Sequence, residues 1–493
     1  MKSSLIIHWC IGLCMFVLVG CSEDIKVTGH LDFDPEVYPD YKGVTIPPNI
    51  APMNFEVLSY KDSDWALILM ASRKTYNLYA NDGVFSFEDN FWKTLLADNR
   101  GEILAFQLCL KEDNGWKACK TFEMRIAEEN IDPYLVYRLI PPGYSLWKEM
   151  GIYQRNLGNF EETAIYKNRE GKGNCVNCHS FRERCPDEML LHMRSELAGT
   201  YVVRNGNMEK LDTKTEQTLS ALVYPYWHPS GRYVAFSVNK TFQVLHARNV
   251  NRIEVCDEAS DVVVYDVDKR EIVTSAILNS ENAYETFPAF SPDGKSLYFC
   301  SAVAVDSMPK QFRDVKYSLC RISFDEKKRS FGTEVDTLYN AIMQGRSASF
   351  PRVSPDGQKL VYTLSDYGNF SIWHKDADLY SVNLQTGQTV CLDALNSDDV
   401  ESYHSWSSNS RWMVFSSRRE DGLYTKPYIV YVPAEGTPHK PFLLPQQNPK
   451  AYYKAQMNAY NIPELVSGKV EMDSRSLSNF ANEGQSISVS FVP

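Results

Sequence analysis

Three residues close together in the sequence, Cys175, Cys178 and His179, have the types and spacing needed for redox chemistry. They form the pattern Cys-x-x-Cys-His, which is the attachment signal for a c-type haem. Two thiols add across the two vinyl groups of one haem, and the adjacent imidazole can then bind the iron as its proximal ligand. The pattern predicts one covalent haem c, with all three residues binding the cofactor and His179 as a metal ligand.

Two other kinds of site also place cysteines three positions apart. A zinc site would need a second pair at similar spacing, and the nearby extra thiol is Cys185. A thioredoxin-like redox pair would need a βαβ context, whereas the surroundings here are polar and contain glycine. Haem c is therefore the leading interpretation, with a structural or redox thiol pair as the alternative.

The iron of a c-type haem normally takes a second axial ligand from methionine or histidine. Residues 187–197 have helical spacing, with Met189 and Met193 on one face and His192 close to one turn from Met189. This predicts a short helical haem-binding segment in which His192 and Met189 are the candidate ligands and Met193 is the next. The alternative is that the methionines are ordinary core residues and His192 lies on the surface.

The first residues resemble the signal of bacterial lipoproteins. Residues 1–20 contain Lys2 and a mostly apolar run, and end in Leu-Val-Gly directly before Cys21. This resemblance implies cleavage before Cys21 and lipidation of its thiol. A single membrane span would need about 20 apolar residues, which is longer than this run. In that family a Ser22 after the cysteine implies transfer to the outer membrane.

Export and haem attachment are mutually consistent, because c-type haem is attached outside the cytoplasmic membrane. We therefore expect a protein of the Gram-negative cell envelope, tethered by the lipid on Cys21 to the outer membrane and not embedded in it. Whether it faces the periplasm or the cell surface is left open. The expected partner is an envelope redox or docking protein.

Composition excludes one class of partner. The formal net charge is −11 and no basic cluster stands out, so nucleic acid is not expected to bind. An aromatic content of 13% favours β-rich structure. A length of 493 residues predicts two to four domains.

The chain before the Cys-x-x-Cys-His motif divides into three regions. Residues 21–52 are polar and contain several prolines, which predicts an extended tether. Residues 53–127 contain short strand-like runs separated by turn residues, which predicts a small antiparallel β-sandwich. Residues 128–198 are predicted to be a connector that carries the haem segment.

Cys109 and Cys119 are the best candidates for a disulfide. A three-residue loop at residues 113–115 would place them opposite each other across a hairpin. The same register would face Lys111 with Lys117, which counts against it. Reduced, buried thiols are the alternative.

A repeated sequence motif predicts the fold of the remaining chain. Each copy has an apolar strand after a tight turn, and the motif recurs about 60 residues apart. The four copies are Trp227–Phe236 (WHPSGRYVAF), Phe290–Phe299 (FSPDGKSLYF), Val353–Tyr362 (VSPDGQKLVY) and the degenerate Trp406–Phe415 (WSSNSRWMVF). A further strand follows each copy, and four strands per repeat make one propeller blade.

These copies resemble the TolB-like (PD40, WD40-like) β-propellers of Gram-negative envelopes. The resemblance covers residues 199–445, and residues 446–493 are predicted to form a C-terminal tail. A lipoprotein signal, one Cys-x-x-Cys-His motif and such a propeller together resemble envelope lipoproteins of cytochrome type. The expected fold class is mainly β: an N-terminal β-sandwich-like domain, a short helical haem-binding segment and a C-terminal β-propeller.

Three functions remain open on this basis. The first is electron transfer or another redox-linked role through the haem. The second is a non-catalytic propeller that binds or scaffolds an envelope protein or glycan. The third is an enzyme with an open haem position. No catalytic residues are predicted, and a haem electron-transfer or binding protein is favoured over an enzyme.

Overall fold

The computed structural model describes residues 25–141, 149–170, 174–246, 251 and 253–492. The predicted signal peptide and the lipidation site Cys21 lie outside these residues. None of the described helices is both long and apolar enough to span a bilayer.

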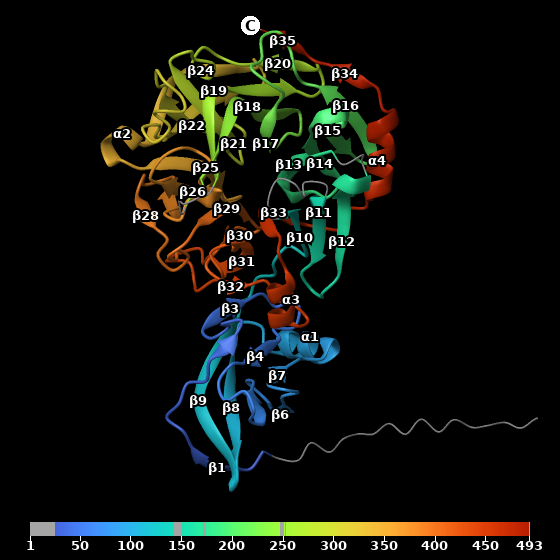
Figure 1. Ribbon diagram of the computed structural model, residues 1–493, viewed down its shortest axis with the longest axis vertical. Coiled ribbons are helices and arrows are strands. Elements are labelled where there is room, and N and C mark those ends of the chain that lie inside the picture. Colours follow the sequence, from blue (N-terminus) through green and yellow to red (C-terminus); the bar gives the residue numbers. More distant parts are fainter. Residues whose placement is uncertain (1–24, 142–148, 171–173, 247–250, 252, 493) are drawn as a thin grey trace, which may run out of the picture.

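Six sheets, each with four antiparallel strands and two of them with a fifth, parallel edge strand, form the larger part of the molecule (Figure 1). Their innermost strands contact one another in a closed cycle of β33, β13, β17, β21, β25 and β29. The protein is therefore mainly β and contains a β-propeller, as predicted, and the ring has six blades.

The blades are numbered here in chain order. Blade 1 contains β10 (Tyr134–Ile140), β11 (Gly151–Asn156), β12 (Glu162–Lys167) and β33 (Ala459–Val466), and blade 2 contains β13 (Val176–Phe181), β14 (Glu188–Met193), β15 (Gly199–Arg204) and β16 (Asn207–Asp212). Blade 3 contains β17 (Val223–Trp227), β18 (Tyr233–Leu245), β19 (Ile253–Asp266) and β20 (Glu271–Val273), and blade 4 contains β21 (Ala283–Phe290), β22 (Ser296–Val303), β23 (Ser318–Asp325) and β24 (Ser330–Tyr339). Blade 5 contains β25 (Ser347–Val353), β26 (Lys359–Ser365), β27 (Asp378–Asn383) and β28 (Thr389–Cys391), and blade 6 contains β29 (Glu401–Trp406), β30 (Trp412–Ser417), β31 (Lys426–Tyr431) and β32 (Phe442–Leu443).

The ring is closed by strands from two distant parts of the chain. Strand β33 pairs antiparallel with β10 and becomes the innermost strand of blade 1. The chain then continues through α4 (Ser474–Glu483), and β34 (Ser486–Ser488) and β35 (Ser490–Val492) add parallel edge strands to blades 2 and 3. The region predicted as a C-terminal tail, with α3 (Pro449–Ala455) at its start, thus joins three blades and covers two sheet edges.

The tight turns of the repeat form where the motif predicts them. Gly231, Gly294 and Gly357 have φ of 72°, 71° and 71°, and Ser410 takes the same place in the degenerate copy with φ of 61°. A residue other than glycine is uncommon at such φ, which explains why three copies keep Pro-x-Gly. These turns connect the two innermost strands of blades 3 to 6.

The predicted helix over residues 187–197 is wrong. Residues 188–193 form β14, and every residue in it is buried between β13 and β15. A fully buried strand has apolar residues on both faces, so its sequence does not alternate and resembles a helix by spacing alone. The ring of blades also begins earlier in the chain than predicted. Its first strand starts at Tyr134, within the region predicted as a connector, and not at Gly199.

The N-terminal region folds as two sheets and one helix. The larger sheet has the order β1-β9-β8-β5-β6 with β3 beside β9, and the smaller has the order β2-β4-β7. The bounds are β1 (Val27–His30), β2 (Val37–Tyr38), β3 (Val44–Ile46), β4 (Phe55–Val57), β5 (Trp65–Met70), β6 (Thr75–Tyr79), β7 (Val84–Phe85), α1 (Asp89–Asp98), β8 (Ile103–Glu112) and β9 (Gly115–Ile126). Residues 27–46, predicted as tether, therefore belong to these sheets.

This N-terminal unit packs on blade 6. Its core continues into Trp412, Ile429 and Phe442 of that blade without a break. Hydrogen bonds also cross the junction; for example, Trp412 Nε1 donates to the Glu129 carbonyl at 3.0 Å and Tyr41 donates to the Leu443 carbonyl at 3.2 Å. The shared core holds the two units as one body at the outer side of the ring (Figure 1).

Cys109 and Cys119 do not lie opposite each other across the hairpin, so their predicted pairing is wrong. In the β8–β9 hairpin Cys109 lies opposite Ala118, and Glu112 lies opposite Gly115, so the loop is one residue shorter than expected. A bulge between Gln107 and Cys109 compensates for the shift. Cys119 then faces the main core while Cys109 faces a separate small cluster, and both are free thiols.

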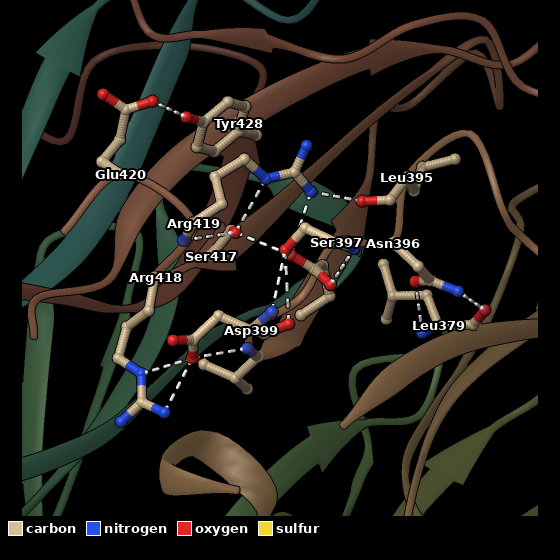
Figure 2. Close-up of polar contacts among 12 residues, drawn as sticks. Leu379, Leu395, Asn396, Ser397, Asp399, Ser417, Arg418, Arg419, Glu420 and Tyr428 are labelled. Carbon is tan, nitrogen blue, oxygen red and sulfur yellow. Dashed lines mark hydrogen bonds and ion pairs between the residues drawn. The ribbon is translucent and has the colours of Figure 1, made fainter. Parts of the chain in front are cut away.

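A buried polar network connects the loops around blade 6 (Figure 2). Glu401 is fully buried, and its Oε1 accepts from Arg419 Nη2 at 2.9 Å and from the hydroxyls of Ser397 and Ser417 at 2.7 Å each. Burial raises the pKa of Glu401, and the Arg419 cation opposes that shift. The network fixes the start of β29, whose far end reaches the site described next.

Candidate functional site

Each of the six innermost strands contains one residue with a left-handed backbone. They are Cys178 (φ 48°), Tyr224 (49°), Phe287 (51°), Phe350 (52°), Tyr403 (48°) and Ile462 (49°). The pairing register shifts at the same place in every blade, so each residue belongs to a β-bulge. The second cysteine of the predicted haem motif therefore occupies a position of the propeller repeat.

These six residues, named here the axial plug, fill the centre of the ring. The ring centroids of Tyr224 and Phe287 are 4.6 Å apart, those of Phe287 and Phe350 4.2 Å, and those of Phe350 and Tyr403 4.4 Å. Aromatic contacts at these separations add to the stability gained by burial alone. The plug lies where the six innermost strands meet.

His179 follows the plug residue of blade 2, and its repeat position is usually occupied by proline. The equivalent residues are Pro225, Pro288, Pro351, His404 and Pro463. The His179 side chain is fully buried, and neither ring nitrogen has a hydrogen-bond partner of good geometry among the described residues. Its Nε2 lies 3.5 Å from Glu464 Oε2. Burial, together with the Arg138 cation, lowers the pKa of His179 to about 3, so the imidazole is neutral.

The predicted second ligands lie on strand β14, next to the motif. His192 pairs with Asn177, and Met189 pairs with Phe181. Residues 189 and 192 project to opposite faces of the strand, because successive side chains alternate. Met189 packs in the core between blades 1 and 2, whereas His192 Nδ1 lies 3.3 Å from the Thr200 hydroxyl. The two alternative candidates for the second axial ligand therefore lie on opposite faces of β14.

A covalent haem would need Cys175, Cys178 and His179 around one space large enough for a porphyrin. Cys175 is half-buried before β13, Cys178 belongs to the axial plug and His179 lies beneath Glu464. The adjoining cavity has a volume of about 110 Å³, whereas pockets for drug-sized ligands have roughly 300–1,000 Å³. In this conformation the three residues do not fit a haem, since β13 would first have to leave the ring.

The cavity itself, named here the channel-mouth cavity, lies on the ring axis beyond the plug. All six blades contribute to its wall, including Glu464, Phe181, Trp227, Phe290, Arg352 and Trp406. The indole nitrogen of Trp227 donates to the Ser180 carbonyl at 3.3 Å, and that of Trp406 donates to the Arg352 carbonyl at 3.1 Å. With these polar atoms satisfied, the two indoles serve as apolar walls.

The ionisable groups of the cavity are Glu464, Arg352 and Arg184. Glu464 Oε2 is buried and has no hydrogen-bond partner among the described residues. Burial raises the pKa of Glu464 to about 8, although the Arg352 and Arg184 cations and a backbone hydrogen bond at Phe181 oppose the shift.

The two arginines are held by backbone carbonyls. Arg352 Nη1 donates to the Pro351 carbonyl at 2.8 Å, and its guanidinium lies 5.1 Å from the centre of the Tyr226 ring. Arg184 Nε donates to the Trp406 carbonyl at 2.9 Å. Within the described part of the chain neither guanidinium has a carboxylate within 4.0 Å, whereas the adjacent Arg182 pairs with Glu188 and Glu183. The cavity thus contains two cations without counter-ions.

Sequence analysis missed these three residues. Arg184 lies in the predicted connector and Glu464 in the predicted tail, so nothing in the sequence brings them together. Arg352 had a weak signal, because it stands between Phe350-Pro351 and Ser354-Pro355 of the repeat, where blade 4 has Ala289. Among the described residues, no group of three or more His, Cys, Asp or Glu side chains is placed to hold a metal ion.

Comparisons with known proteins add a distant likeness in fold. No family model matches the chain, and no curated protein matches it. Similar solved structures include Kuenenia stuttgartiensis hydrazine synthase, with 10% identity over 65% of this chain and 48% of that chain and a TM-score of 0.42. The β-propeller domain of the Trilobed protease from Pyrococcus furiosus has 11% identity over 68% of this chain and 81% of its own, with a TM-score of 0.33. The tricorn protease has 12% identity over 68% of this chain and 32% of its own, with a TM-score of 0.33. At this similarity none of their activities is carried over to this chain.

Proposed function

We propose that this chain is a non-catalytic binding protein of the Gram-negative cell envelope, and that it holds a group of its partner in the channel-mouth cavity. The observation that carries the proposal is the polar lining of the cavity, where the buried Glu464 Oε2 has no hydrogen-bond partner among the described residues and the guanidinium groups of Arg352 and Arg184 bind backbone carbonyls but no carboxylate. Leaving a buried acceptor such as Glu464 Oε2 without a partner costs free energy, and a bound ligand would supply that partner.

The mode of attachment belongs to the same proposal. The signal resemblance at residues 1–20 supports lipidation of Cys21 and a tether to the outer membrane. Export of the natural chain and of a Cys21→Ser variant, followed by membrane fractionation and metabolic labelling with a fatty acid, tests this. Equal labelling and equal membrane association of the two proteins would refute the anchor.

Site-specific photo-crosslinking in the exporting cell tests the binding site. A photoreactive amino acid replaces Ser405, which lines the cavity, and in a control it replaces Ile342, which is 78% exposed on α2 (Ala341–Gln344). We expect a discrete adduct from position 405 that disappears in the Arg352→Gln background. The same adduct pattern from both positions, or no adduct at position 405, would contradict a binding site at the channel mouth.

A second candidate function is electron transfer through a covalent haem. It is favoured by the Cys175-x-x-Cys178-His179 spacing together with the two unpartnered ring nitrogens of His179. This candidate requires that haem is attached during export, before β13 takes its place in the closed ring. Intact-mass measurement of protein exported from a host with haem-attachment machinery tests it, with Cys175→Ala as the matched control. A mass without the added porphyrin, and no absorbance difference from the control, would eliminate this candidate.

A further inference from the structure

The described chain begins at the end of the N-terminal unit that lies farthest from the propeller. Strand β1 runs parallel to β9 with Val27 opposite Trp116, so the two strands start at the same end of their sheet. At about 3.3 Å per residue, the 12 residues of β9 span about 40 Å. Beyond the other end of β9, the Glu129 carbonyl accepts from Trp412 of blade 6. Figure 1 accordingly shows β1 at the opposite end of the molecule from the ring.

Two further segments lie beside the start of β1, and the whole end of the unit is named here the anchor tip. The backbone N–H of Lys111, at the end of β8, donates to the Asp64 carbonyl at 3.0 Å, so the loop before β5 lies next to the β8–β9 turn. Tyr79, the last residue of β6, lies opposite Ala66 at the start of β5. The anchor tip consists of residues 25–28, 60–64, 79–82 and 111–117.

The anchor tip exposes aromatic side chains to solvent. Tyr60 and Tyr79 are 58% and 46% exposed, and they are the two exposed large hydrophobic side chains of the described residues 25–127. The Tyr79 ring centroid lies 5.9 Å from that of Trp116, and Lys111 Nζ lies 4.8 Å from the Trp116 ring centre. Tyrosine and tryptophan combine an apolar ring with a polar group, and lysine combines an apolar stem with a charged end, so these side chains suit the boundary between lipid and water.

The proposed lipid anchor is close to these side chains in the sequence. Cys21 stands four positions before Ile25, and an extended chain spans at most about 3.6 Å per residue, so the lipid and the anchor tip can be at most about 14 Å apart. We propose that the anchor tip contacts the headgroup region of the membrane that holds the lipid on Cys21, and that the N-terminal unit thereby holds the propeller away from that membrane. This rests on the proposed attachment through Cys21 and names the surface that faces the lipid.

Attraction between opposite charges contributes little to this contact. The anchor tip contains four lysines and five acidic residues, so its net charge is close to zero, whereas the whole chain has a net charge of −11. A nearly neutral surface is neither strongly attracted nor strongly repelled by anionic lipids. The contact therefore depends on the lipid anchor and the aromatic rings, and it should change little with ionic strength.

Site-specific photo-crosslinking of the lipidated full chain in isolated membranes tests the contact. A photoreactive amino acid replaces Asn114, which is exposed in the β8–β9 turn, and in the matched control it replaces Arg125, which is exposed on β9 near the propeller. We expect phospholipid adducts from position 114, and none from position 125 or from position 342 on the propeller. The yield at position 114 should be equal at low and high salt and should fall when Tyr60→Ser and Tyr79→Ser are combined.

The opposite results would overturn the proposal in distinguishable ways. Adducts from position 342 and none from position 114 would mean that the propeller faces the membrane. Equal adducts from positions 114 and 125 would mean that the N-terminal unit lies flat on the lipid. A yield that falls with salt, or that is unchanged by the two tyrosine substitutions, would refute the role of the aromatic rings. If fatty acid labels Cys21 but no position gives a lipid adduct, the anchor stands and the contact is refuted, whereas loss of both signals refutes both.

Discussion

Replacing Arg419 with methionine should destabilise the propeller strongly, because it leaves a buried charge without its counter-ion. Glu401 is fully buried, and Arg419 is its cationic partner at 2.9 Å. The Ser397 and Ser417 hydroxyls that also bind Glu401 remain in the variant, but they carry no charge. Removing one partner of a buried ion pair costs about 3–5 kcal/mol.

The most specific part of this prediction is how the destabilisation by Arg419→Met depends on pH. Burial already raises the pKa of Glu401 above its unfolded value, and loss of Arg419 raises the folded pKa further. A carboxyl with a raised folded pKa stabilises the fold below its unfolded pKa, and that stability is lost as the pH rises through the folded value. The destabilisation by Arg419→Met should therefore be larger at pH 8 than at pH 5.

Urea denaturation followed by tryptophan fluorescence at the two pH values provides the assay. The matched control is Arg411→Met, because Arg411 and Asp356 form a half-exposed pair at 3.7 Å that is worth about 0–1 kcal/mol. The double variant Arg419→Met with Glu401→Gln should recover part of the loss. A loss for Arg419→Met no larger than that of the control, or one independent of pH, would refute the reasoning.

Three further predictions concern the plug, the cavity and the thiols. Phe350→Ala should lower the free energy of unfolding by about 3–5 kcal/mol in thermal or chemical unfolding, because Phe350 is 2% exposed. The control Ile342→Ala, at an exposed position, should change it by less than about 0.5 kcal/mol. Equal effects of the two substitutions would contradict a packed plug. Between pH 5 and pH 8 the melting temperature of the natural protein should fall, because the stabilisation that comes from the raised pKa of Glu464 disappears over that range. Glu464→Gln should make this fall smaller. An unchanged pH profile in the variant would contradict a raised pKa of Glu464. Cys109 and Cys119 should both react with a thiol reagent in denaturant without prior reduction, and failure to do so would mean that they are oxidised.

The repeat could be predicted from the sequence because its signals are local. Pro-x-Gly turns need a left-handed backbone at the glycine, and Gly231, Gly294 and Gly357 have it. An apolar strand follows each turn, so strand and turn are both encoded within ten residues. Blade 2 was not predicted because β13, β14 and β15 are buried almost throughout, and blade 1 was not predicted because Ala459–Val466 completes it from more than 300 residues away.

The Cys-x-x-Cys-His motif shows where a local pattern stops being decisive. By spacing alone, Cys178 and His179 predict haem attachment. In the fold the same two residues take the place of Tyr224-Pro225 and Phe287-Pro288 in other blades, which is a packing role. Only the pairing of six distant strands reveals that equivalence, since the bulge it depends on exists only when the strands are paired.

The sequence by itself determined the β-rich repeat and its tight turns. It also contained the signal that predicts export and the Cys-x-x-Cys-His motif that predicts haem. Each of these depends on residues close together in the chain. The tertiary structure decided that six blades close around an axial plug, and that Arg184, Arg352 and Glu464 meet at one end of it. The physical reason is that ring closure brings the ends of all six innermost strands to one axis. Residues from blades 1, 2 and 5 become neighbours there without any local signal in the sequence.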